Sequence, residues 1–269
     1  ASHHTALAHA AATRAIKAVR PDATVGLTVN MNNIHNESPD DQEVVDFAAL
    51  NDSNLNRWWI EALLTGKYPQ NLVDCYGPML SNVVLPGDEK LLLAAPDFLG
   101  INYYCDGFVR SPRAHDKPAI EGGFMPFPQR ADGSAPANLA NDLTAMGWVV
   151  TPEGLGNLVK RVHRDYPHIP YVVITENGSS YDDVKVDGEV VDTKRTAYLV
   201  AHLQSLQAAI SEGAPVKGYF AWSLLDNFEW AEGYAKRFGI VHVDYETFER
   251  TPKLSFKRYK EIIGINSAN

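Results

Sequence analysis

The apolar residues of this chain follow two alternating patterns that predict strands and helices. Four short runs rich in Val, Ile, Leu and aromatic residues are typical of buried strands. Segments with apolar residues at helical spacing lie between and around them. The predicted strands cover 23–30, 96–104, a run from 171 that stops at Thr175-Glu176-Asn177-Gly178, and 216–226, and the predicted helices cover 5–20, 41–65, 151–167, 192–212 and 252–263. This alternation favours an α/β fold with a parallel sheet.

The predicted helices carry residues that mark where helices begin and end. Gly66 and Gly213 directly follow two of them, as a glycine that ends a helix commonly does. Thr151 precedes Pro152 and is predicted to cap the helix over 151–167, and Asp192 is predicted to cap the next one. Residues 111–145 carry five prolines and predict a long loop, which in a compact domain is usually functional or mobile.

Polar and aromatic residues gather where the predicted strands end. Asn30 closes the first strand, Asn102 and Tyr104 the second, Glu176 the third, and Trp222 stands in the fourth. A (β/α)8 TIM barrel carries its active site at this carboxyl-terminal edge of its strands. Only four strands are predicted where a barrel needs eight, so we interpret residues 1–269 as about half of one barrel, without a separate second domain.

The composition argues against several classes of function. The 269 residues are 45% hydrophobic and carry a net charge of -9 without a basic stripe, which argues against nucleic acid as a partner. No G-x-G-x-x-G or Walker motif follows a strand and no metal-binding spacing is present, so neither a cofactor nor a metal is predicted. No apolar run of about 18 residues suggests a membrane span, and two cysteines in so long a chain suit a cytoplasmic location.

Glu176 raises the main chemical question, because a carboxylate ends an otherwise apolar strand. At the mouth of a barrel it could act as a nucleophile, a general acid or base, or a metal ligand. The residues alone favour a structural alternative, in which Glu176 caps the turn at Asn177-Gly178. They likewise favour core packing for Trp222 and Trp230, and a solvated surface position for Glu229.

Four stretches considered together resemble one known family. They are ITENG, WSLLDNFEWAEGYAKRFGIVHVDY at 222–245, DFLGINYY and TAMGWVVTPEGL. In order and spacing they are similar to motifs of glycoside hydrolase family 1, the retaining β-glucosidases and β-galactosidases, and the similarity covers essentially the whole chain. The resemblance implies a (β/α)8 barrel to which this chain contributes the C-terminal half, strands five to eight with their helices.

The resemblance implies catalytic roles at the ends of two strands. Glu176 would attack the anomeric carbon as the nucleophile and form a covalent glycosyl-enzyme. Tyr104 would donate a hydrogen bond that orients Glu176, and Asn102 would line the same site. Ser179 departs from the residues that usually follow Glu-Asn-Gly in the family, a change that concerns the loop and not the carboxylate.

The resemblance also implies a sugar pocket. Trp222 would form its apolar floor, Glu229 would accept hydrogen bonds from two sugar hydroxyls with Trp230 beside it, and Phe238 would close it near the 6-position. The 6-phospho-glycosidases of the family carry Ser where Glu229 stands and Tyr where Phe238 stands. Because a carboxylate at 229 would repel a sugar phosphate, unphosphorylated β-glucosides are expected, with galactosides and fucosides as further candidates.

Two further residues would face the aglycone, the part of the substrate that leaves. Trp148 would flank that site, and Asn30 is a second candidate for it. A tryptophan platform beside the long loop at 111–145 suits β-linked aryl glucosides and short oligosaccharides.

The acid/base glutamate of the family has no counterpart here. It belongs to a T-x-N-E-P motif, and the only Asn-Glu pair before the nucleophile is Asn36-Glu37, followed by Ser38-Pro39, which we do not accept as a substitute. A partner is therefore expected: an N-terminal half, as a separate or cleaved chain, or a second copy. The alternative function is a non-catalytic sugar-binding fragment or pseudo-enzyme that keeps Trp222, Glu229 and Trp230 and turns nothing over.

Overall fold

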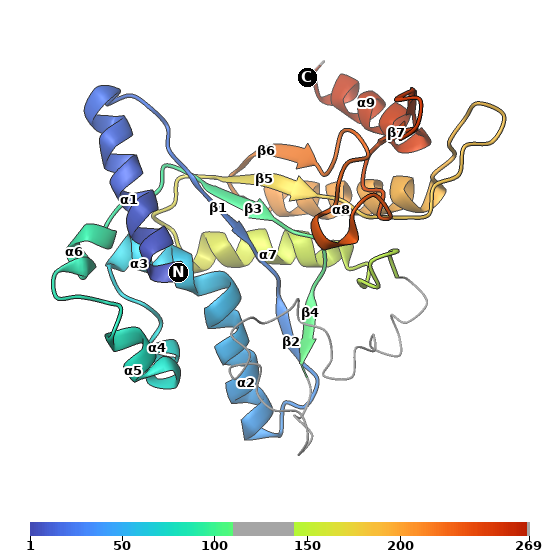
Figure 1. The fold of residues 1–269 in the computed structure, drawn as a ribbon. Helices are drawn as coiled ribbons and strands as arrows, with labels where there is room; N and C mark the ends of the chain where they lie inside the picture. The colour runs from blue at the N-terminus through green and yellow to red at the C-terminus, as the bar shows by residue number, and fades with distance from the viewer. Residues whose placement is uncertain (110–142, 268–269) are drawn as a thin grey trace.

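The central element of the fold is a parallel sheet. The computed structural model describes residues 1–109 and 143–267 (Figure 1). Its four-stranded sheet has the order β1-β3-β5-β6, formed by β1 (Leu27–Asn30), β3 (Leu99–Asn102), β5 (Val172–Asn177) and β6 (Val216–Ala221). The four predicted strands and their alternation with helices are confirmed, although β1, β3 and β6 are each shorter than predicted.

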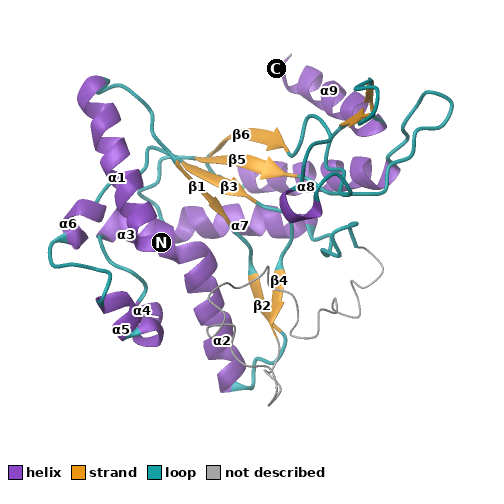
Figure 2. Ribbon diagram, in the orientation of Figure 1, coloured by secondary structure: helices purple, strands orange, loops and turns teal. Residues whose placement is uncertain are grey.

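The helices lie mainly around one side of this sheet. They are α1 (Ser2–Val19), α2 (Gln42–Asp52), α3 (Trp58–Thr65), α4 (Gln70–Tyr76), α5 (Pro78–Ser81), α6 (Asp88–Leu92), α7 (Pro152–Asp165), α8 (Thr193–Ser211) and α9 (Leu254–Ser267), with a π-helix, η1 (Ser53–Arg57), and a 3-10 helix, η3 (Trp230–Glu232). Helices α7 and α8 pack against each other and run along one face of the sheet (Figure 2).

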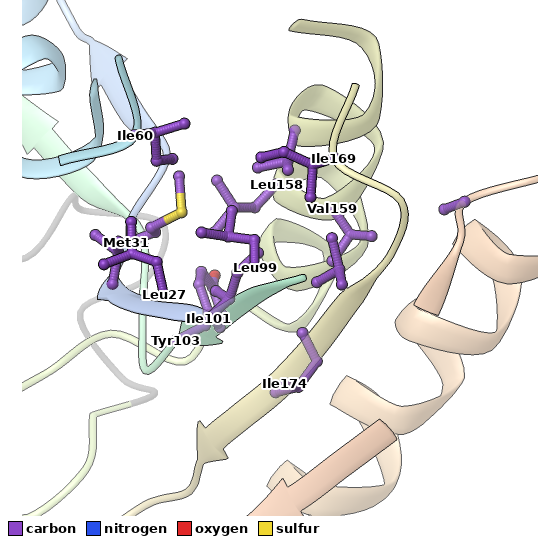
Figure 3. Packing of buried hydrophobic residues seen from close by; sticks show 14 of the residues in the cluster. Leu27, Met31, Ile60, Leu99, Ile101, Tyr103, Leu158, Val159, Ile169 and Ile174 are labelled. Carbon is purple, nitrogen blue, oxygen red and sulfur yellow. The ribbon is translucent and has the colours of Figure 1, made fainter. Parts of the chain in front are cut away.

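The core lies between that face and the helices. Leu27 and Val29 of β1 are buried while Thr28 and Asn30 are exposed, so the strand alternates between a covered and an open face. Figure 3 shows the covered side, where strand residues meet residues of α3 and α7. The labelled members of this cluster are Leu27, Met31, Ile60, Leu99, Ile101, Tyr103, Leu158, Val159, Ile169 and Ile174.

The opposite face of the sheet remains accessible. Thr28 and Asn30 of β1 are exposed, and Phe220 of the edge strand β6 is 61% exposed. A Cβ built on Gly100 would lie 2.4 Å from Thr28 Oγ1 and 2.9 Å from Thr175 Cγ2, so Thr28 and Thr175 both project from this face beside Gly100. A parallel sheet is normally covered on both faces, so an open face with an exposed phenylalanine is unusual for a sheet that stands alone.

Two smaller sheets were not predicted. Strand β2 (Ile34–Asn36) pairs in parallel with β4 (Gly107–Val109), and β7 (Val241–Val243) pairs antiparallel with β8 (Arg250–Pro252). Each of these four strands is only three residues long, too short for an alternating pattern to reveal.

The helical segment predicted over 41–65 is confirmed, but it contains a π-helical turn, η1, between α2 and α3 that was not predicted. The side-chain amide of Asn56 in η1 accepts from the Asn32 backbone N–H at 3.0 Å and donates to the Asn32 carbonyl at 2.7 Å. A π-turn widens the helix locally and re-aims such a side chain. Asn56 thereby fixes the backbone just after β1.

Neither of the two predicted side-chain helix caps forms. Thr151 and Asp192 occupy the N-cap positions of α7 and α8, but neither side chain caps its own helix. Thr151 Oγ1 accepts from the backbone N–H of Asp106, while Asp192 accepts from Ser255 and Arg195. Both side chains hydrogen-bond to groups in other parts of the fold instead of to the backbone N–H groups in the first turn of their own helix. Gly66, by contrast, ends α3 in the left-handed conformation as predicted, at φ 72°.

The predicted loop over 111–145 lies outside the described residues, apart from its last three positions.

Candidate active site

The sheet register aligns three of the predicted residues at one edge. Asn30 pairs with Asn102, and Asn102 pairs with Glu176, so these residues sit at matching positions on three neighbouring strands. The register between β3 and β5 shifts just before Asn102, which sets Glu176 rather than Thr175 opposite it. Trp222 directly follows β6 at the same edge.

Glu176 contacts Tyr104 directly. Tyr104 Oη donates to Glu176 Oε2 across 2.5 Å, as predicted, in a partly buried environment. Burial raises the pKa of Tyr104, and the hydrogen bond to Glu176 raises it further, so the phenol stays protonated and keeps its donor. The Tyr104 backbone carbonyl accepts from Tyr198 Oη at 2.8 Å, which fixes the tyrosine from behind.

The structural alternative for Glu176 was to cap the turn that follows it. In the structure, its neighbours Asn177 and Gly178 make the structural contacts at this turn. Asn177 is fully buried; its side chain donates to the Tyr103 carbonyl at 2.8 Å and accepts from Tyr219 Oη at 2.7 Å. A Cβ on Gly178 would lie 1.7 Å from the Trp222 carbonyl oxygen, so only glycine lets the two strand ends approach. Sequence reasoning missed both functions, although the Asn-Gly pair itself was visible.

Aromatic rings from two other segments lie next to Tyr104. Its ring centroid lies 5.3 Å from that of Trp148 and 6.0 Å from that of Phe238, and the Trp148 and Phe238 centroids are 6.0 Å apart. Such tilted and edge contacts are favourable between aromatic groups. Phe238 is only 2% exposed, so its ring is packed against these neighbours.

The loop after β6 brings a second carboxylate toward Glu176. Burial raises the pKa of Glu229, a hydrogen bond from the Trp222 side chain lowers it, and the charge of Glu176 raises it; the net pKa lies above the ordinary value. Trp222, Glu229 and Glu176 therefore share one local environment. Trp230 differs, because it lies on η3 with 82% of its surface exposed.

Hydrogen bonds join the loops that carry these residues. Lys236 Nζ donates to the Ala145 carbonyl at 2.7 Å, and the Ala145 N–H donates to the Ser180 carbonyl at 2.8 Å. The segments of Trp148, Glu176 and Phe238 are thus connected by one side-chain and one backbone hydrogen bond. Asn30, the remaining candidate, is exposed at the end of β1.

The chemistry of this edge rests on carboxylates and aromatic surfaces. Within residues 1–109 and 143–267, no group of three or more His, Cys, Asp or Glu is placed to hold a metal ion. None of the helices in those ranges is both long and apolar enough to cross a membrane. An oriented carboxylate beside indole and phenol rings can bind the hydroxyls and apolar faces of a sugar.

Curated proteins and solved structures resemble this chain in sequence and in fold. Beta-glucosidase A of Acetivibrio thermocellus is 37% identical over 267 residues, covering 98% of this chain and 56% of the relative. A 6-phospho-beta-galactosidase of Leptotrichia buccalis is 34% identical, covering 97% of this chain and 59% of the relative. The crystal structure of a psychrophilic beta-glucosidase from Micrococcus antarcticus superposes with a TM-score of 0.86 at 38% identity, covering 98% of this chain and 58% of that one.

The chain spans little more than half the length of these relatives. Solved relatives of this kind are beta-glucosidase barrels, so the sheet described above corresponds to part of a (β/α)8 fold. The family model for glycosyl hydrolase family 1 matches residues 1–268, and the protein therefore belongs to glycosyl hydrolase family 1.

Proposed function

We propose that this chain carries the nucleophile and much of the sugar pocket of a retaining β-glycosidase. The observation that supports this most strongly is Glu176 at the carboxyl end of β5, with Tyr104 Oη 2.5 Å from its Oε2. A carboxylate held this way keeps its other oxygen available for an anomeric carbon. Tyr104 remains protonated, so its neutral phenol donates a hydrogen bond that orients the carboxylate.

The proposed reaction proceeds in two displacements. Glu176 attacks the anomeric carbon, the bond to the leaving oxygen breaks, and that oxygen takes a proton from a general acid. The general acid, which has given up its proton, then acts as a base and removes a proton from water. That water attacks the anomeric carbon and releases Glu176. Retaining enzymes hold their two carboxyl groups roughly 5–5.5 Å apart for these steps.

The second carboxyl group is proposed to come from another segment. The sequence contains no T-x-N-E-P motif, and we propose that residues 1–269 form strands five to eight of one barrel whose other strands carry the acid/base. The open face of the sheet supports this, because Phe220, Leu224 and Phe228 are each more than half exposed around the β6 edge. An N-terminal half is the occupant we favour, and a second copy is the alternative.

Substitution of Tyr104 tests the orientation of the nucleophile. In the assembled enzyme, Tyr104→Phe is expected to lower kcat roughly 10- to 100-fold, the effect of losing one hydrogen bond to a charged group. The ring contacts with Trp148 and Phe238 remain, so Tm should change little. Tyr166→Phe is the matched control, because Tyr166 Oη also faces a carboxylate, Glu61, at 3.4 Å but away from this edge. A change of less than twofold in kcat for Tyr104→Phe would contradict the assigned role.

Substitution of Glu229 tests the preference for unphosphorylated sugars. Its negative charge stands beside Trp222, and like charges repel most strongly where water is partly excluded. Glu229→Ser is expected to raise kcat/KM for an aryl 6-phospho-β-glucoside, relative to the plain glucoside, by about tenfold or more. Glu246→Ser, which removes an exposed acid in the turn between β7 and β8, should leave that ratio unchanged. An unchanged ratio in Glu229→Ser would remove the basis for this preference.

The stereochemistry of hydrolysis tests the function itself. The assembled protein should release β-glucose first from an aryl β-glucoside, followed only later by the α-anomer through mutarotation, as NMR of the anomeric protons can record. Release of the α-anomer first would rule out a covalent intermediate. Binding of the glucoside without any turnover would favour the alternative, a non-catalytic sugar-binding protein that retains Trp222, Glu229 and Trp230.

A further inference from the structure

A cluster of buried charges lies outside the candidate active site, beneath the loops that form it. Its members come from the loop after β5, from α8, from the loop after β6 and from the start of α9. They are Asp183, Asp192, Arg195, Asp226, Arg237 and Lys253. Three acids and three bases balance, and Lys253 and Arg195 are 0% and 2% exposed. Buried charges persist only where each has a partner.

Arg195 donates four hydrogen bonds through its rigid guanidinium, which carries five N–H groups. The acceptors are the Ser179 carbonyl at 3.0 Å from Nε, Asp183 Oδ1 at 3.0 Å and Asp192 Oδ2 at 2.6 Å from Nη1, and the Arg237 carbonyl at 2.7 Å from Nη2. Asp183 Oδ2 adds a close ion pair at 2.7 Å from Nη2.

Two of these acceptors belong to the two loops of the site. Ser179 lies three residues after Glu176, and Arg237 lies directly before Phe238. The plane of one guanidinium thus binds both backbones at once, while Asp192 on its own helix fixes that plane in place. A guanidinium is rigid and planar, so the separation of the two carbonyls follows from its geometry.

The loop after β6 is held by bonds that do not involve Arg195. Asp226 accepts from Arg237 Nη1 at 2.6 Å, from Lys253 Nζ at 2.9 Å and from the Gly239 N–H at 3.0 Å. This loop would therefore keep its shape if the link through Arg195 were weakened.

Two further contacts join the two loops beside Arg195. Lys253 Nζ also donates to Asp183, and the Tyr181 N–H donates to the Arg237 carbonyl at 3.4 Å. Arg195 contributes the shortest bond to the Arg237 carbonyl, at 2.7 Å, and acts mainly on the placement of one loop relative to the other.

We infer that Arg195 is a positioning residue that sets the distance between the Glu176 loop and the sugar-binding loop at 222–240. This inference rests on the function proposed above for Glu176. Lysine cannot replace arginine here, since its ammonium has three donors and no planar fork. An error of about 1 Å in the placement of reacting groups costs on the order of 100-fold in rate.

The test compares Arg195→Lys with wild type in the assembled enzyme, formed with the N-terminal segment that its relatives carry. A 2-fluoro glucoside with a dinitrophenolate leaving group measures the inactivation rate constant at saturation and the binding constant Ki separately. We expect the rate constant to fall roughly 10- to 100-fold while Ki changes less than about threefold. Hydrogen exchange should become faster in 178–183 and 236–240 together.

The matched control is Arg161→Lys. Arg161 also forms a two-pronged ion pair, with Asp52 at 2.7 and 2.6 Å, but it joins α7 to the α2 region away from the loops. Its Tm should fall about as much as that of Arg195→Lys, with the inactivation kinetics unchanged. If Arg195→Lys does not fold, Asp183→Asn replaces it as the test variant, because it keeps the guanidinium and weakens one of its ion pairs. Its inactivation rate constant should fall, by less than in Arg195→Lys, while Ki stays nearly unchanged.

The outcomes separate the two proposals. Unchanged exchange in either loop, or equal changes in rate constant and Ki, would overturn the role of Arg195. Wild-type protein that forms no adduct would overturn the proposed function of Glu176, and the exchange measurement would still decide whether Arg195 links the loops.

Discussion

Replacement of Glu176 by alanine is expected to lower kcat of the assembled enzyme on aryl β-glucosides by roughly 10⁴-fold or more, the scale of losing a nucleophile. Glu176 lies at the end of β5, so the truncation leaves the strand pairing untouched. Tyr104 loses its acceptor but keeps its contacts with Trp148 and Phe238. The fold should therefore survive, and the loss should be in chemistry and not in Tm.

An external anion provides the control for this prediction. The space left by the side chain should admit azide, which would attack the anomeric carbon from the same side and give an α-glycosyl azide. Replacement of Glu212, an exposed acid paired with Lys160, should leave kcat unchanged and should create no azide product. A Glu176→Ala enzyme with kcat within tenfold of wild type would show that another group is the nucleophile.

The second large effect concerns assembly. Addition of the proposed N-terminal half is expected to raise kcat/KM for an aryl β-glucoside by roughly 10²- to 10⁴-fold over the 269-residue chain alone, the usual contribution of general acid catalysis. The gain should be smaller for a dinitrophenyl glucoside, because a good leaving group needs little protonation.

Two controls decide what the added segment supplies. An N-terminal segment with the acid/base glutamate changed to glutamine should assemble equally well and give the gain only with the activated substrate. Sedimentation of the chain alone tests the alternative that a second copy covers the Phe220 face. Equal activity with and without the segment, on both substrates, would contradict the proposal that a carboxyl group comes from outside this chain.

Much of the sheet could be predicted from the sequence, for a physical reason. Leu27, Val29, Leu99 and Ile101 are buried by the helices, so their apolar pattern is strong and the strands that hold them stand out. The π-turn at Ser53–Arg57 could not be seen, because it depends on the contact between Asn56 and the distant Asn32 backbone. Local spacing carries no information about such a partner.

The site was only partly predictable for a related reason. The contact of Glu176 with Tyr104 follows from residues that end adjacent strands, which motif resemblance can recover. Arg195 and Lys253 are charged side chains, which are rarely buried without partners. Apart from Asp192, three residues before Arg195, their partners lie far away in the sequence, where local patterns cannot reveal them. Thr151 and Asp192 have the residue types of helix caps, yet better hydrogen bonds from Asp106 and Ser255 determined their orientation.

The most direct test of the central claim is to trap the covalent intermediate. The assembled enzyme is treated with the 2-fluoro glucoside bearing a dinitrophenolate leaving group, digested, and analysed by peptide mass spectrometry. We expect one sugar per chain, attached to Glu176 in the peptide containing Thr175-Glu176-Asn177-Gly178. A sugar attached to any other residue, or no adduct in a preparation that hydrolyses β-glucosides, would contradict the assignment of Glu176 as the nucleophile.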